Sequence, residues 1–78
     1  MTLQEMLEQF SEMEIPESAF WLGKPELAEM KSGMYYDSGR WIVYFREKGQ
    51  FTNHVEFSTQ GEACEELYRR LKRLYHRS

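Results

Sequence analysis

The stretch of residues 40–57 constrains the fold more than any other part of this sequence. Residues 40–46 are rich in aromatic and β-branched side chains, which favour strands. Residues 51–57 alternate apolar and polar side chains, the pattern of a half-buried strand. Between the two runs, Gly49 stands where a tight turn needs a positive φ. The stretch therefore predicts a β-hairpin.

An amphipathic helix is expected on each side of the strands. Thr2 and Glu5 have the spacing of a capping box, apolar residues then recur at helical spacing over residues 3–13, and Pro16 ends the helix. Thr59 and Glu62 form a second capping pair ahead of the last helix. The apolar stripe of that helix consists of Ala63, Cys64, Leu67, Tyr68, Leu71 and Leu74.

The segments between the first helix and the hairpin add further structure. Residues 19–22 predict a strand or an extended segment, residues 25–30 could form a brief helical turn, and residues 34–36 predict another strand. A chain of 78 residues makes a single domain. We therefore expect one α+β domain over residues 1–78, with an N-terminal helix, a three- or four-stranded antiparallel meander and a C-terminal helix. Both helices should lie on one face of the sheet.

Strand alternation gives the sheet a core face and an open face. The expected core comprises Phe10, Trp41, Val43, Phe45, Val55, Phe57, Leu67 and Leu71. The alternation also places Phe51 and Asn53 on the core face, beside Val55. The open face is expected to carry Ile42, Tyr44, Arg46, Thr52, His54 and Glu56. Because tyrosine and arginine are enriched at protein interfaces, this open face is a candidate contact surface.

Few residues could support catalysis or metal binding. The one cysteine, Cys64, lies on the apolar stripe of the last helix and is expected to be buried, and the two histidines, His54 and His76, are far apart. These residues supply neither a disulfide nor a complete zinc site. The five glycines occur singly at turns, so no phosphate-binding loop is predicted. We therefore predict a protein that is not an enzyme and that has no cofactor and no metal.

Charge is unevenly distributed along the chain. Residues 1–39 contain eight acidic side chains against two basic ones, and residues 40–78 contain five against eight. The acidic half can steer association with a cationic partner. The alternative is a nucleic-acid-binding or regulatory domain that uses the basic end of the last helix, with Arg69, Arg70, Lys72, Arg73, His76 and Arg77. Acidic residues at the start of the same helix would repel phosphate and argue against this alternative.

The sequence also bears on localisation. No run approaches the roughly 18 apolar residues that span a bilayer. The first residues lack the basic start and apolar stretch of a signal peptide. A lone free cysteine suits a reducing compartment. We therefore expect a cytoplasmic protein without a membrane partner.

Three stretches carry a resemblance to a known group of proteins. Residues 15–23 read IPESAFWLG, residues 41–49 read WIVYFREKG, and residues 57–67 read FSTQGEACEEL. Together with the short N-terminal helix, they are similar to small bacterial proteins that are encoded beside polymorphic toxins and are treated as their immunity proteins. The resemblance implies that the chain binds and inhibits a cognate protein toxin, expected to be a cationic, nuclease-like domain. Immunity proteins bind through surfaces that differ from one to the next, so no functional residue carries over.

Two surfaces are expected to contact such a partner. The open sheet face should supply affinity, because tyrosine and arginine dominate hot spots, and the acidic helix should steer association. The predicted partner-binding residues are Tyr44, Arg46 and His54 on the sheet, and Glu8, Glu12, Glu14 and Glu17 on the first helix and the turn after it. The identity of the toxin and the oligomeric state stay open.

Overall fold

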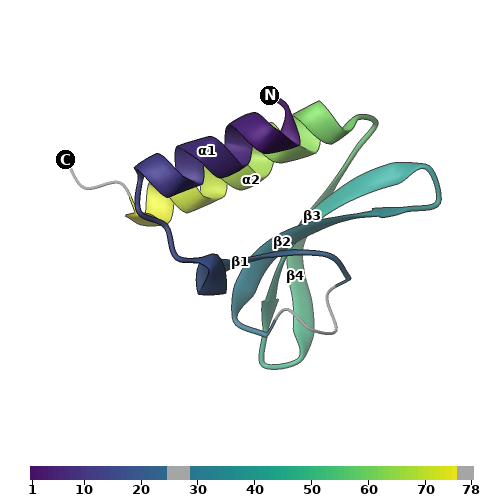
Figure 1. The fold of residues 1–78 in the computed structure, drawn as a ribbon. Helices are drawn as coiled ribbons and strands as arrows, with labels where there is room; N and C mark the ends of the chain where they lie inside the picture. The colour runs from purple at the N-terminus through teal and green to yellow at the C-terminus, as the bar shows by residue number, and fades with distance from the viewer. Residues whose placement is uncertain (25–28, 76–78) are drawn as a thin grey trace.

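The structure, a computed structural model, describes residues 1–24 and 29–75. Its elements are helix α1 (Leu3–Glu12), the 3₁₀ turn η1 (Glu17–Ala19), strands β1 (Phe20–Leu22), β2 (Lys31–Asp37), β3 (Arg40–Glu47) and β4 (Gln50–Phe57), and helix α2 (Gln60–Tyr75). The two helices lie side by side, run in the same direction and cover one face of the sheet (Figure 1). The expected α+β fold, with both helices on one sheet face, is confirmed.

The four strands form one sheet in the order β1-β2-β3-β4. Strands β2, β3 and β4 pair antiparallel as expected, but β1 runs parallel to β2, with Trp21 opposite Gly33. The expected antiparallel meander is present in β2, β3 and β4, and β1 adds a parallel strand at one edge. A parallel neighbour requires a connection that carries the chain back along the sheet, and the segment between Leu22 and Lys31 makes that connection. The helical turn expected in residues 25–30 falls largely on residues 25–28, outside the described residues.

Side-chain caps define where the helices begin. The backbone N–H of Glu5 donates to Thr2 Oγ1 over 3.1 Å, and the Thr2 N–H donates to Glu5 Oε1 over 2.8 Å, so the predicted capping box is present. At α2 the Glu62 N–H donates to Thr59 Oγ1 over 3.2 Å. The Glu62 carboxylate there accepts from the Thr59 hydroxyl rather than from the backbone.

Both hairpins turn through pairs of residues with positive φ. Ser38 and Gly39 have φ of 50° and 81°, and Lys48 and Gly49 have φ of 50° and 76°. Two consecutive left-handed residues make the tight turn whose twist suits adjacent antiparallel strands. The predicted hairpin turn with Gly49 is confirmed.

A β-bulge in β4 changes which side chains face the helices. The register shifts between Val43 and Phe45, because Asn53 and His54 together stand opposite one residue of β3. Asn53 has a φ of 50°, as the first residue of such a bulge often does. Phe51 consequently pairs with Arg46 and lies on the face away from the helices, so its assignment to the core face is wrong.

The core lies between the two helices and the inner face of the sheet. Its buried members are Met6, Phe10, Ile15, Met34, Val43, Ala63, Cys64, Leu67 and Leu71. Four residues of the expected core are therefore buried, and Trp41 and Phe57 pack against it while partly exposed. Phe45 is also only partly buried. Val55 was also expected in the core but is 42% exposed, because β4 is an edge strand and Val55 lines a groove beside α2.

Candidate protein-binding surfaces

The sheet face away from the helices is not an open surface. Tyr44 on β3 is 0% exposed and Ile42 is 8% exposed. The Tyr44 hydroxyl donates a 2.7 Å hydrogen bond to the carbonyl oxygen of Gly23, and its ring lies 5.7 Å from that of Tyr35 and 5.3 Å from that of Phe51. The expectation that Tyr44 is available to a partner is therefore corrected, because neighbouring aromatic side chains and the chain after β1 cover it.

The other two residues predicted on this face lie at its margin. Arg46 is partly buried, and its Nε lies 4.0 Å from the carboxylate of Glu29, which also accepts from the Gly49 N–H over 2.9 Å. His54 is exposed, and its ring stacks on Phe51 with the ring centres 4.9 Å apart. Tyr44 and His54 therefore both contact the ring of Phe51, but the burial of Tyr44 prevents the two from forming an exposed aromatic site.

The four predicted acidic residues are at the surface. Glu8 and Glu12 project from α1, Glu14 lies in the turn after it, and Glu17 begins η1. None of these carboxylates forms an ion pair within residues 1–24 and 29–75. Their charge is thus available to act on an approaching partner.

An exposed group of apolar side chains from α1 and three strands was not expected from the sequence. Leu7 is 36% exposed, Leu22 41% and Tyr36 57%. The last two line a hollow of about 270 Å³ together with Leu3 and Trp41, and Leu7 lies one helical turn beyond Leu3. We call these five residues, Leu3, Leu7, Leu22, Tyr36 and Trp41, the apolar patch.

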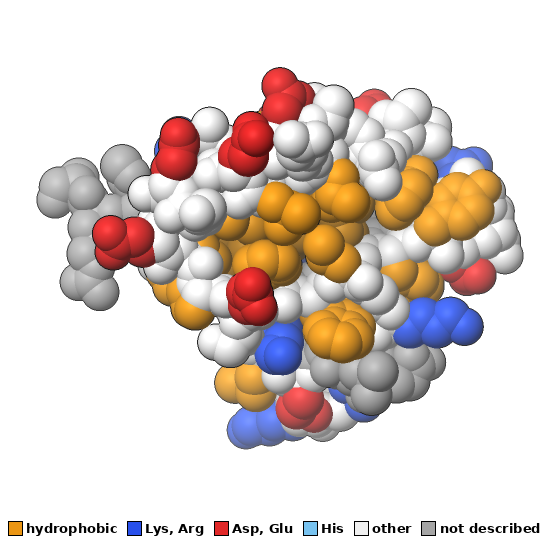
Figure 2. All heavy atoms as spheres, in the orientation of Figure 1, with side chains coloured by type: hydrophobic (Ala, Val, Ile, Leu, Met, Phe, Trp, Pro, Cys, Tyr) orange, Lys and Arg blue, Asp and Glu red, His pale blue; other side chains and the backbone are white. Residues whose placement is uncertain are grey.

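Acidic side chains surround much of the apolar patch. Figure 2 shows apolar side chains gathered beneath α1, with carboxylates above them along the helix and another below them near the position of η1. The patch joins α1 to β1, β2 and β3, so its residues are distant in sequence. The only sequence signal for it is the spacing of Leu3 and Leu7 at one margin of the helix.

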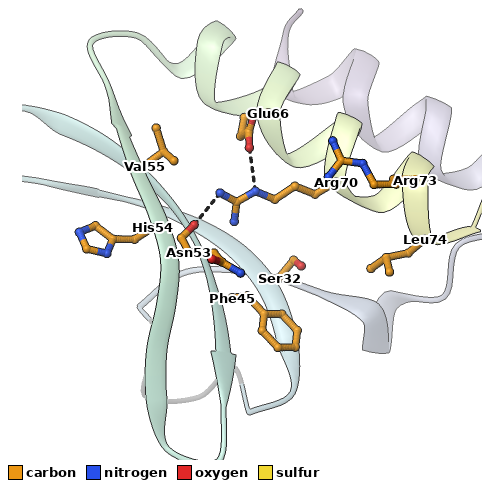
Figure 3. Close-up of a pocket in the computed structure, with 9 residues that line it drawn as sticks. All are labelled: Ser32, Phe45, Asn53, His54, Val55, Glu66, Arg70, Arg73 and Leu74. Atoms are coloured by element: carbon orange, nitrogen blue, oxygen red, sulfur yellow. Dashed lines mark hydrogen bonds and ion pairs between the residues drawn. The ribbon is translucent and has the colours of Figure 1, made fainter.

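A second concave surface lies at the other side of the molecule, between α2 and β4. This α2–β4 groove has a volume of about 710 Å³ and is lined by Ser32, Phe45, Asn53, His54, Val55, Glu66, Arg70, Arg73 and Leu74. Figure 3 shows Arg70 reaching from α2 to β4, where its Nη2 donates to the Asn53 carbonyl oxygen over 2.6 Å. No pattern in the sequence indicates this groove, because the bulge and the helix that form it meet only in the folded chain.

The basic end of α2 is partly neutralised within the helix. Arg69 and Arg70 both pair with the Glu66 carboxylate over 2.8 Å. The ammonium of Lys72 lies over the ring of Tyr68, 5.6 Å from its centre. Of the cations considered for nucleic-acid binding, three are thus engaged, and His76 and Arg77 lie outside the described residues.

In the described part of the chain, the side chains that could react or bind a metal do not come together in one site. Cys64 is buried in the core as expected, and this burial raises the pKa of its thiol. Among the described residues no three histidine, cysteine or acidic side chains come together as a metal site would require. Neither described helix has the length and apolar character needed to cross a membrane.

Comparisons with known proteins place no relative beside this chain: it matches no protein-family model, no curated protein and no solved structure.

Proposed function

We propose that this domain binds a cognate protein toxin and neutralises it, and that the apolar patch with the acidic side of α1 is the contact surface. The observation that carries the proposal is the exposure of Leu7, Leu22 and Tyr36 in one apolar area beside unpaired carboxylates. Exposed apolar patches with a polar rim mark protein-binding sites. The sequence resemblance to immunity proteins supports the choice of a toxin as the partner.

The two parts of the surface have different roles in this proposal. Tyr36 and Trp41, whose ring centres are 5.2 Å apart, supply a rigid aromatic centre that loses water when the partner docks. Glu8 and Glu12 are exposed on α1 outside this centre, where charges chiefly accelerate association with an oppositely charged protein. A cationic toxin domain with an apolar centre would complement both parts.

The charge distribution favours a protein partner over nucleic acid. The acidic rim would repel phosphate, whereas the cations of α2 that could attract it are partly neutralised by Glu66. We therefore retain the toxin as the partner and do not propose a nucleic-acid function.

The test is co-expression of this chain with the toxin domain encoded beside it, in cells that the toxin kills. Rescue of growth, co-purification of a complex and loss of toxin activity in the presence of the pure chain are the expected results. Normal killing despite soluble expression of this chain would disprove the function. A complex without inhibition would establish binding and overturn neutralisation.

Matched variants locate the surface. Tyr36→Ala should weaken the complex by about 2 kcal/mol or more if Tyr36 is a hot spot. Tyr75→Ala is its control, because Tyr75 is also exposed but lies at the far end of α2. Leu22→Lys should weaken binding as well, whereas Leu74→Lys on α2 should not. If the control variants weaken the complex instead, the toxin binds on the α2 side and the assignment of the apolar patch is wrong.

A further inference from the structure

We propose that the α2–β4 groove is a second binding site, and that it takes an extended acidic peptide segment of a partner protein, added as a strand beside β4. The groove and the apolar patch share no residue, because the groove is lined by α2 and β4 with Ser32 and Phe45, whereas the patch combines α1 with Leu22, Tyr36 and Trp41. This site is therefore independent of the surface proposed for the toxin.

The first argument is the free edge of β4. In the described part of the chain, β4 pairs with β3 on one side and with no strand on the other. Six of its eight residues are exposed. An unpaired edge offers backbone N–H and C=O groups to an incoming strand, which is how several peptide-binding domains recognise their ligands.

The shape of the groove fits an added strand. A strand placed beside β4 would direct every second side chain toward the sheet face that carries α2, at the margin of the groove. Val55 on β4 and Leu74 on α2 provide apolar contacts for such a side chain, whereas Phe45 on β3 and Ser32 on β2 line the groove farther from the β4 edge. Figure 3 shows Val55 directed toward α2, whereas the His54 ring points away from it.

The bulge decides where pairing can occur. The carbonyl oxygen of Asn53 already accepts a 2.6 Å hydrogen bond from Arg70, so an added strand cannot use it without breaking that bond. We therefore expect the peptide to pair along residues 55–57, which follow the bulge.

The charge of the groove selects an acidic peptide. The single carboxylate lining it, Glu66, is already paired with Arg70 over 2.8 Å. Arg73 lines the same groove and has no hydrogen-bond or ion-pair partner among residues 1–24 and 29–75. A carboxylate on an inward-facing side chain of the peptide would pair with the Arg73 guanidinium, which binds carboxylates through parallel N–H donors.

The acidic surface of a second copy of this chain does not fit as well. Glu8 and Glu12 are on a helix, and a helix cannot add to a strand edge through backbone hydrogen bonds. The occupant is therefore a separate, extended segment with alternating apolar and acidic residues on its inward side.

The probe is the peptide Thr-Val-Thr-Glu-Thr-Val-Thr-Glu, titrated into the isotopically labelled protein and followed by amide chemical shifts. The same peptide with lysine in place of glutamate is the charge control. The amides of residues 55–57 should shift with the glutamate peptide and shift far less with the lysine peptide. Arg73→Ala should weaken binding about tenfold, the effect of one charge-assisted hydrogen bond, while Lys72→Ala should bind like the parent. Both side chains are exposed, so both variants should fold.

Four results would overturn the proposal. The first is the absence of shifts in β4, and the second is equal binding of the two peptides. The third is equal affinity of the Arg73→Ala and Lys72→Ala proteins for the glutamate peptide. The fourth is a dependence of the β4 shifts on protein concentration without peptide, which would make a second copy of the chain the occupant.

Discussion

The hydroxyl of Tyr44, in the middle of β3, donates a 2.7 Å hydrogen bond to the carbonyl oxygen of Gly23, which directly follows β1. Strand β2 lies between the two residues, so the tyrosine spans it and holds the end of β1. The crossing is possible because Gly33 on β2 has no side chain beneath the tyrosine. A Cβ at that position would overlap the Tyr44 hydroxyl and come within 2.6 Å of the Trp21 carbonyl oxygen.

We expect Tyr44→Phe to destabilise the domain by about 1 kcal/mol, because the partly buried Gly23 carbonyl loses its donor while the ring is retained. Urea unfolding followed by tryptophan fluorescence measures the change. Tyr36→Phe is the matched control, because Tyr36 is exposed and should change the free energy of unfolding by less than about 0.5 kcal/mol. Equal stabilities of the two variants would mean that the Tyr44 hydroxyl does not hold β1.

Gly33→Ala should destabilise the protein by about 1–3 kcal/mol, because the added methyl group displaces the tyrosine or β1. Gly61→Ala is the comparison, because Gly61 lies in the first turn of α2 and an added Cβ would meet only the Met1 backbone, at 3.3 Å, so the stability should change less than in Gly33→Ala. Thermal melts of both variants test the expectation. A Gly33→Ala protein that melts at the parent temperature would contradict the close packing of Tyr44 over β2.

Two leucines of α2 should differ sharply on truncation. Leu67 is 0% exposed and Leu74 is 68% exposed, although they lie on the same helix. Leu67→Ala should cost about 2–5 kcal/mol through lost apolar burial and a cavity, whereas Leu74→Ala should stay within about 0.5 kcal/mol of the parent. Equilibrium denaturation measures both. The packing of α2 on the sheet would be wrong if the two costs were similar.

Cys64 should react slowly with thiol reagents in the folded protein. Burial raises the pKa of its thiol from the ordinary value of 9.0, so little thiolate forms at neutral pH. The unfolded chain releases this proton at lower pH than the folded chain. Ionisation of the thiol therefore lowers the free energy of unfolding as the pH rises above about 9. Thiol labelling with and without urea tests whether burial slows the reaction. Fast native labelling would show that the thiol is accessible.

The pH dependence is tested by comparing the parent with Cys64→Ala. The free energy of unfolding of the parent should fall more than that of the variant between pH 8 and about pH 10.

Reversal of charge on α1 should slow association with the toxin. Glu8→Lys combined with Glu12→Lys should lower the association rate constant, and the difference from the parent should fade as salt shortens the Debye length to about 8 Å or less. The control is Glu47→Lys combined with Glu56→Lys, which changes the net charge by the same amount but places the new charges on β3 and β4. This control should lower the association rate constant less. Surface-plasmon kinetics at several salt concentrations distinguishes the variants. Equal slowing by both pairs would assign the effect to net charge rather than to the position of α1.

Short-range patterns of the sequence were sufficient for the helices and the turns. The Thr2 and Glu5 capping box, the helical apolar spacing and the glycines with positive φ act over a few residues, so a single sequence reveals them. The burial of Cys64 and Leu67 followed from the same helical spacing. For the candidate surfaces, Glu8, Glu12, Glu14 and Glu17 are exposed, and their contact with a partner stays a prediction.

The tertiary structure alone decided the sheet faces and the concave surfaces. The bulge at Asn53 and His54 adds one residue to β4, so every residue before it faces the opposite side of the sheet from the side that simple alternation predicts. Alternation within one strand cannot reveal the extra residue, because it becomes evident only in the pairing with β3. The parallel pairing of β1 with β2 likewise depends on contacts between distant segments. That pairing brings Leu22 beside Tyr36 in the apolar patch and places Gly23 where it binds Tyr44. Local sequence therefore determined the elements, because their free energies depend on near neighbours, whereas the register and packing of the strands determined which side chains a partner can reach.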